Sequence, residues 1–191
     1  MEENKETKLK IFKYNAILSM IFFLTSSIYF GKQIQNYNLN KYTISAISNF
    51  LNQEKLSYFN ATFIIKALMD LSFGFYVFKY FKIPLFSPTA LFWILATLSF
   101  GLLGFFPSAK YVLIHNIIVA ILFLTFSLSE YLLAKLTKDE KFIYLTNNFL
   151  IVQISSILLF FITANFNGVF EIFYMFMAFF WLMIFIRNYL K

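Results

Sequence analysis

The sequence contains no cysteine and a single histidine among its 191 residues. Without cysteine the chain cannot form disulfides, use a catalytic thiolate or ligate an iron–sulfur cluster. One histidine cannot supply a paired haem-ligand set or a structural zinc site. We therefore expect no cofactor and no metal ion, since helix spacing alone does not bring Asp70, His115 and Glu171 together as a ligand set.

Charged residues are also scarce, at 13% of the chain, whereas hydrophobic residues make up 60%. Soluble domains usually contain about 25% charged residues, so this balance indicates an integral membrane protein. The net charge of +7 does not indicate nucleic-acid binding, because the sequence has no basic soluble domain with base-stacking groups. The 29 phenylalanines are expected to pack the interior and to face lipid.

Six segments are apolar enough to cross a bilayer, which takes about 20 residues each. An isolated strand would leave its backbone unpaired in lipid, so all six should be helices. We predict an all-α polytopic membrane protein, a single membrane domain of six transmembrane helices in one bundle. Ser87 followed by Pro88 predicts the start of the third span, because proline suits a first helical turn. The spans are placed near residues 11–30, 60–78, 88–106, 111–134, 142–164 and 169–186.

The distribution of basic residues predicts the orientation of these spans, because cytoplasmic loops carry an excess of lysine and arginine. With the N-terminus inside, the cytoplasmic group is Lys5, Lys8, Lys10, Lys13, Lys79, Lys82, Lys135, Lys138, Lys141, Arg187 and Lys191, and the outer group is Lys32, Lys41, Lys55 and Lys110. We predict a multi-pass protein of the cell membrane with both termini cytoplasmic. The first span should stay attached, since its apolar run is too long for a signal peptide and no cleavage site follows.

One connection, residues 31–59, is far longer than the usual link between two helices. Loops of this length are commonly functional. Within it, Ile44, Ile47 and Leu51 follow the i, i+3, i+7 spacing of one helical face. We predict a short interfacial helix here, lying over the outer mouth of the bundle. A plain surface cover is the alternative.

Two opposite charges, Lys66 and Asp70, lie inside the second span. Their i, i+4 spacing puts both on one helix face, where they can neutralise each other. Charges at that depth are costly and usually mark a functional site. We expect a polar cavity that binds a head group or relays protons, with a structural pair or a link to another subunit as the alternative. Glu130, in the other half, lies near the end of its span and could reach water.

Three more polar residues are expected near this pair, in the outer half of the bundle. Asn60 begins the second span, so Lys66 and Asp70 lie about 9 and 15 Å deeper at 1.5 Å per residue. His115 and Glu171 lie just inside the outer ends of spans four and six. His115 is a candidate for acid/base chemistry or head-group binding, or for a plain hydrogen bond between helices. Glu171 could pair with Lys66 or cap the last helix at its positive end.

Several short motifs run along most of the chain. They are Ile44-Ser-Ala-Ile-Ser-Asn-Phe-Leu51, Tyr58-Phe-Asn60, Gly104-Phe-Phe-Pro107 followed by His115, and Gly168-Val-Phe-Glu171. Together they resemble the prokaryotic domain-of-unknown-function-998 family of six-helix membrane proteins. The resemblance implies the same six-helix fold and adds Ser48 and Asn49 to the expected binding residues. The family usually has Asp in place of Asn49 and small residues near Lys66, and it implies no particular activity.

Three functional hypotheses follow. The first is a non-catalytic membrane protein that binds lipid or serves as an accessory subunit of a larger membrane complex, with membrane lipids and other subunits as partners. The second is a lipid-modifying enzyme that uses His115 with Glu171 or Asp70, which needs two acid/base groups within reach of one substrate position. The third is a small proton-coupled transporter, although the internal repeats typical of transporters are not visible. We favour the first.

Overall fold

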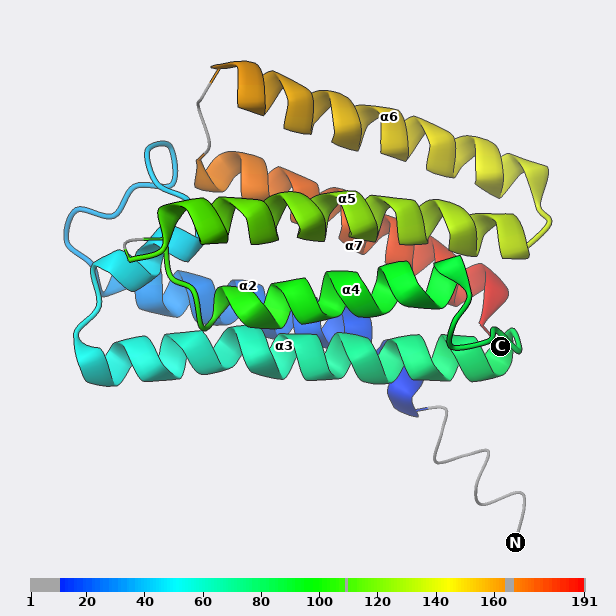
Figure 1. Cartoon of the computed structure of the whole chain (residues 1–191), viewed down its shortest axis with the longest axis horizontal. Coiled ribbons are helices and arrows are strands. Elements are labelled where there is room, and N and C mark those ends of the chain that lie inside the picture. The colour runs from blue at the N-terminus through cyan, green and yellow to red at the C-terminus, as the bar shows by residue number, and fades with distance from the viewer. Residues whose placement is uncertain (1–10, 109, 164–166, 191) are drawn as a thin grey trace, which may run out of the picture.

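The structure is a computed structural model that describes residues 11–108, 110–163 and 167–190. The described residues are all-helical and contain no strand (Figure 1). Their six α-helices are α2 (Asn15–Lys32), α3 (Gln53–Tyr80), α4 (Pro88–Leu103), α5 (Val112–Leu136), α6 (Glu140–Thr163) and α7 (Gly168–Tyr189). Two short 3₁₀ helices are η1 (Ile11–Tyr14) and η2 (Ser45–Asn49). Lys5, Lys8, Lys10, Lys191 and the predicted end of the fifth span at 164 lie outside the described residues.

Five of these helices are long and apolar enough to cross a membrane, namely α2 together with η1, α3, α5, α6 and α7. The sixth, α4, is apolar but shorter, with 16 residues. The all-α prediction is confirmed, and the helices have the length and composition of a membrane protein. Each predicted span coincides with one helix, although α3 begins at Gln53, about two turns before the predicted start at residue 60.

Polar side chains determine where three of the helices begin. Ser87 accepts a hydrogen bond from the first turn of α4, and Pro88 occupies that turn, as predicted. Asn167 caps α7 in the same way. Asn52 caps α3, which places the helix start in a polar stretch ahead of the apolar segment. A side-chain cap satisfies one of the N–H groups that have no partner inside the helix, so the polar residues extend α3 beyond its apolar part.

The helices form one bundle in which α2, α3, α4 and α5 pack in chain order. In Figure 1, α3, α4 and α5 lie nearest the viewer, α2 and α7 lie behind them, and α6 lies along one edge. The interior is rich in aromatic side chains, with Phe59, Phe73, Trp93, Trp181 and Phe185 fully buried. The least buried of the candidate spans is α6, so its attachment to the bundle needs a separate explanation.

The first loop, residues 33–52, crosses the end of the bundle where α3 and α7 begin (Figure 1). The sequence predicted a short helix carrying Ile44, Ile47 and Leu51 on one face. The structure has a shorter 3₁₀ helix at this place, η2, whose five residues include Ile47 but neither Ile44 nor Leu51. Ile44 and Ile47 are buried and Leu51 is partly buried. The apolar side chains of the pattern therefore point into the protein, and the loop covers the helix ends beneath it.

Gly104, directly after α4, lets α4 approach α3 closely. A Cβ atom at this position would lie 2.7 Å from the backbone oxygen of Asn60. This distance is too short for two non-bonded atoms, and a backbone oxygen inside a helix cannot turn aside as a side chain can. By contrast, a Cβ at Gly101 would lie 3.2 Å from the Cβ of Ala67. Both glycines face α3, and Gly104 has the less adaptable neighbour.

We expect Gly104→Ala to destabilise the bundle by about 1 to 3 kcal/mol, the usual cost of overpacking an interior. Gly101→Ala is the matched control. Its new Cβ would make a milder contact, with the Cβ of Ala67 at 3.2 Å, and the higher helix propensity of alanine, about 1 kcal/mol, offsets the cost of that contact. Thermal unfolding of the purified protein in detergent micelles measures both variants. An equal change in Tm for the two variants would contradict the close approach at Gly104.

Candidate functional site

Lys66 and Asp70, both on α3, form a salt bridge inside the bundle. The exposed fraction of each residue is 4%, so the pair faces the interior, as the cost of charge in lipid requires. The Lys66 ammonium bonds Oδ2 of Asp70, and the Ser19 hydroxyl of α2 donates to Oδ1. Both carboxylate oxygens therefore have a partner, one from the same helix and one from the neighbouring helix.

The same pair is connected to α4 by two aromatic residues. The Lys66 ammonium lies 4.4 Å from the centre of the Phe100 ring, where the ring face attracts a cation. The indole Nε1 of Trp93 donates to the backbone oxygen of Asp70 at 3.0 Å. Three helices, α2, α3 and α4, thus meet at the pair. This arrangement leaves the charged atoms occupied by protein groups and supports a structural role for the pair.

His115, in the first turn of α5, is buried and uses both ring nitrogens. Its Nδ1 lies 2.7 Å from the backbone oxygen of Phe106, and its Nε2 lies 3.0 Å from Oγ of Ser45. A carbonyl oxygen can only accept, so Nδ1 carries the hydrogen and, in the neutral ring, Nε2 accepts from the Ser45 hydroxyl. His115 therefore connects α5 to η2, which matches the plain hydrogen bond that the sequence left open.

Glu171, in the first turn of α7, contacts the first loop. Its carboxylate accepts a hydrogen bond from the backbone N–H of Ile44, and the cap of α7 is Asn167. The sequence offered two partners for Glu171, Lys66 and its own helix end, and the structure has neither. Within the described residues, the salt bridge of Lys66 is made with Asp70 alone.

The backbone at the start of α7 binds the first loop as well. The N–H of Gly168 lies 2.9 Å from the carbonyl oxygen of Leu39 and 2.8 Å from that of Tyr42, and the N–H of Val169 lies 3.3 Å from Leu39. A Cβ at Gly168 would meet Leu39 at 2.4 Å and the Tyr42 oxygen at 2.9 Å. Glycine is therefore needed here for the loop to reach the helix end, and Glu171 reinforces the same attachment.

The remaining predicted binding residues lie around this loop. Ser48 is buried and donates to the backbone oxygen of Ser45 at 2.7 Å, and Asn49 contacts Ser108 at 3.2 Å. Asn60 is partly buried in the third turn of α3 and helps to form the close approach at Gly104 through its backbone oxygen. Ser48 and Asn49 thus stabilise the loop, while Asn60 contributes backbone packing.

Two cavities lie beneath the first loop, and Ile44 lines both. The smaller has a volume of about 50 Å³ and is lined by Ser45 and Glu171 together with apolar side chains such as Phe63 and Phe100. This is room for about one or two water molecules, each of which occupies about 30 Å³ in the liquid. Among the predicted site residues, Glu171 lines this space, which is too small for a lipid head group.

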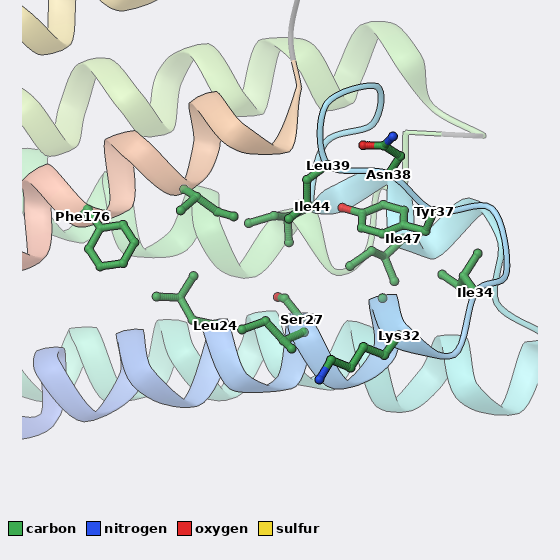
Figure 2. A pocket seen from close by; sticks show the side chains of 13 residues that line it. Leu24, Ser27, Lys32, Ile34, Tyr37, Asn38, Leu39, Ile44, Ile47 and Phe176 are labelled. Atoms are coloured by element: carbon green, nitrogen blue, oxygen red, sulfur yellow. The ribbon is translucent and has the colours of Figure 1, made fainter.

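The larger cavity, of about 620 Å³, lies between α2 and α7 and is roofed by the first loop (Figure 2). Leu24 and Ser27 line it from α2, Phe176 lines it from α7, and Ile44 and Ile47 line it from the loop. Its lining is mainly apolar. The sequence did not indicate this cavity, because apolar residues on a transmembrane helix look the same whether they line a cavity, pack or face lipid.

Polar groups occur at the loop end of this cavity. Tyr37 donates its hydroxyl to the backbone oxygen of Thr43 at 2.9 Å, and burial, with a smaller contribution from Glu171, raises the pKa of Tyr37. Its hydroxyl therefore stays protonated and keeps the loop closed on itself. Lys32, the last residue of α2, is exposed at the same end and makes no salt bridge with any described residue.

A second polar cluster, which the sequence did not predict as a site, lies farther along the bundle between α5, α6 and α7. Glu130 has an exposed fraction of 2% and accepts a hydrogen bond from Gln153 at 3.2 Å. Ser127 and the Tyr174 hydroxyl lie 2.7 Å apart. Glu130 does not reach water, in contrast to the expectation from its position near the end of α5. Across the described ranges, no group of three metal-ligating residues occurs.

Replacing one partner of the buried ion pair should cost far more than replacing both. We expect Asp70→Leu or Lys66→Met alone to destabilise the protein by about 3 to 5 kcal/mol, because each leaves an uncompensated charge inside the bundle. The double variant should recover most of that loss, because two apolar side chains of similar size leave no charge behind. Chemical unfolding in micelles measures the three variants. If the double variant lost as much unfolding free energy as the two single variants together, the pairing would be contradicted.

Comparisons with known proteins add no relative, since no family model, no curated protein and no solved structure matches this chain. The resemblance to the six-helix family described above therefore stays a prediction. A function must therefore be inferred from the polar residues and cavities of the chain itself. They consist of a buried ion pair, a loop tied to α7, and a large apolar cavity under that loop.

Proposed function

We propose that this chain is an integral membrane protein that binds one lipid, with an acyl chain in the cavity between α2 and α7. The observation that carries the proposal is the volume of that cavity, about 620 Å³. Small-molecule sites usually measure about 300 to 1,000 Å³ and are mostly apolar with a few polar groups. The cavity under the first loop has both properties, and His115 and Glu171 hold the loop that covers it.

The surroundings of the cavity favour a membrane lipid over a water-soluble ligand. Ile28 on α2 and Phe176 on α7 line the cavity and are 54% and 48% exposed. In a spanning helix such apolar surface faces lipid, so an acyl chain can enter from the side without crossing water. The apolar lining then replaces the contacts that the chain had in the bilayer.

Lys32 favours an anionic head group at the loop end. It lies eight residues after Leu24 on α2, about 12 Å along the helix at 1.5 Å per residue. Lysine at the end of a spanning helix extends towards the head-group region, and each basic residue near an anionic surface contributes about 1 kcal/mol. A lipid with its phosphate at Lys32 and its acyl chain directed towards Leu24 fits this spacing.

The positions of the candidate acid/base groups support binding without catalysis. His115 uses both nitrogens on Phe106 and Ser45, and the carboxylates of Asp70 and Glu171 have other partners. An enzyme needs at least two such groups within hydrogen-bond reach of one substrate position. The cavity that is large enough for a lipid is lined by none of these three residues.

We also infer that α4 crosses the membrane, which gives six spans, with both termini cytoplasmic and the first loop at the outer surface. At 1.5 Å per residue α4 is about 24 Å long, somewhat less than the roughly 30 Å hydrocarbon core. Its leucines at positions 91, 95, 98 and 102 are 43–52% exposed, which suits a lipid-facing side. The excess of basic residues on the opposite side from the first loop supports this orientation.

Filling the cavity should expel the lipid. We expect wild-type protein, purified in a mild detergent, to carry about one lipid per chain, and Leu24→Trp to lose it because the indole occupies the space of the acyl chain. Leu18→Trp is the matched control, since Leu18 is on the same helix but exposed and outside the cavity. Native mass spectrometry counts the bound lipid.

A second variant tests the head group. Lys32→Gln should keep the bound lipid but lose the preference for anionic over zwitterionic lipid when both are supplied at equal concentration, because the attraction depends on the charge.

Full lipid occupancy in Leu24→Trp, or an equal loss in Leu18→Trp, would contradict the binding site. An unchanged lipid preference in Lys32→Gln would contradict the proposed head-group contact alone.

The absence of native cysteine makes the topology directly testable. Asn40→Cys in the first loop and Glu140→Cys at the start of α6 are both at exposed positions. We expect a membrane-impermeant maleimide to label Asn40→Cys in intact cells and Glu140→Cys after lysis, with the cysteine-free chain as background. If both variants were labelled in intact cells, α4 would not cross the membrane.

A further inference from the structure

The contact between Glu130 of α5 and Gln153 of α6 leaves one oxygen of each side chain without a hydrogen bond within the described part of the chain. Nε2 of Gln153 donates to Oε2 of Glu130 at 3.2 Å. Oε1 of Glu130 and the amide oxygen Oε1 of Gln153 are both buried and have no hydrogen-bond partner among the described residues. The exposed fractions are 2% for Glu130 and 1% for Gln153, so two acceptor oxygens lie inside the bundle without a donor.

No counter-ion for Glu130 is found in the part of the chain that the structure describes. Within the described residues it makes no salt bridge. From α7, Tyr174 interacts electrostatically with Glu130; its hydroxyl donates to the backbone oxygen of Phe123 at 3.0 Å and also contacts Ser127. From α6 the facing group is the neutral amide of Gln153. An ionised carboxylate with one hydrogen bond and no counter-ion is very costly in such surroundings.

We propose that Glu130 holds a proton on Oε1 and donates it to Oε1 of Gln153, so that the two side chains form a closed acid–amide pair. In this pair the amide N–H donates to one oxygen of the acid, and the acid O–H donates to the amide oxygen. A single proton thus gives both unpartnered oxygens a hydrogen bond and removes the uncompensated charge. The bundle contains, on this assignment, a proton-binding site that is separate from the lipid cavity.

A proton suits this place better than a metal ion does. Calcium takes about six to eight oxygen ligands, whereas two oxygens are without partners here. A bridging water molecule would also supply two donors, but it would leave the carboxylate ionised. A proton on Glu130 therefore gives both unpartnered oxygens a hydrogen bond and makes a counter-ion unnecessary.

The acid–amide pair also explains how α6 stays attached. The described side chains that connect α6 to its neighbours by hydrogen bonds are Gln153, to Glu130, and Thr146, which accepts from Nε1 of Trp181 at 2.9 Å. Helices in a membrane associate through packing and polar contacts, because lipid tails are as apolar as leucine. As the least buried span, α6 relies on these contacts more than its neighbours do.

Infrared spectroscopy of the full chain in lipid nanodiscs at neutral pH tests the proposal. The carbonyl stretch of a protonated carboxyl group absorbs apart from the bands of an ionised carboxylate, and it moves to lower frequency in heavy water. We expect the spectrum of the wild type minus that of Glu130→Gln to contain one protonated-carboxyl band. Glu130→Gln should fold, because the glutamine amide can donate to Gln153 in place of the acid O–H. Circular dichroism checks its helix content.

The partner is tested with Gln153→Leu, in which Glu130 remains but its acceptor is removed. The protonated-carboxyl band should then move to higher frequency, as it does when a carboxyl O–H loses its hydrogen bond. Glu171→Gln, which changes another buried carboxylate, is the control and should leave the band of Glu130 in place. If Glu130→Gln removed ionised-carboxylate bands instead, or if Gln153→Leu left the band unshifted, the proposal would be overturned. Labelling glutamate with carbon-13 in the wild type assigns the band to a glutamate should Glu130→Gln fail to fold.

Discussion

The attachment of the first loop to the start of α7 is the interaction on which the large cavity depends. The first N–H groups of a helix have no partner inside it and form its positive end. Here the carbonyl oxygens of Leu39 and Tyr42 accept from Gly168, and the Glu171 carboxylate accepts from the N–H of Ile44. The loop and the helix thus satisfy each other's backbone groups. Together with the contact between Ser45 and His115, this exchange holds the loop across α2 and α7.

Two buried acidic side chains, Asp70 and Glu130, each connect neighbouring helices. Asp70 joins α3 to α2 through Ser19 and to α4 through Trp93, and Glu130 joins α5 to α6 through Gln153. Association of helices in lipid gains little from the hydrophobic effect, so it depends on such polar contacts together with close packing. The two carboxylates differ in one respect. Asp70 has a lysine beside it, and Glu130 has an amide.

The sequence predicted those features whose cause is local. The helices follow from apolar length, and the pairing of Lys66 with Asp70 follows from i, i+4 spacing. The contact of Glu171 could not be predicted, because its partner is the backbone N–H of Ile44, 127 residues away, and every residue except proline has such a group. The position of Glu130 near the end of its span suggested that it could reach water. Its burial could not be predicted, because the tilt and depth of a neighbouring helix cannot be read from one span. A cavity likewise depends on how two distant faces fit.

The polar residues and the apolar cavity are connected through one residue of the first loop. The backbone N–H of Ile44 binds Glu171, while its side chain lines both the small cavity and the large cavity. A lipid in the large cavity would contact Ile44 and Ile47 from below, and any ligand that binds the ordered state stabilises that state. On the proposed function, the carboxylate and the lipid would act on the same loop from two sides. Glu171, which touches no lipid, is on this view a positioning residue for lipid binding.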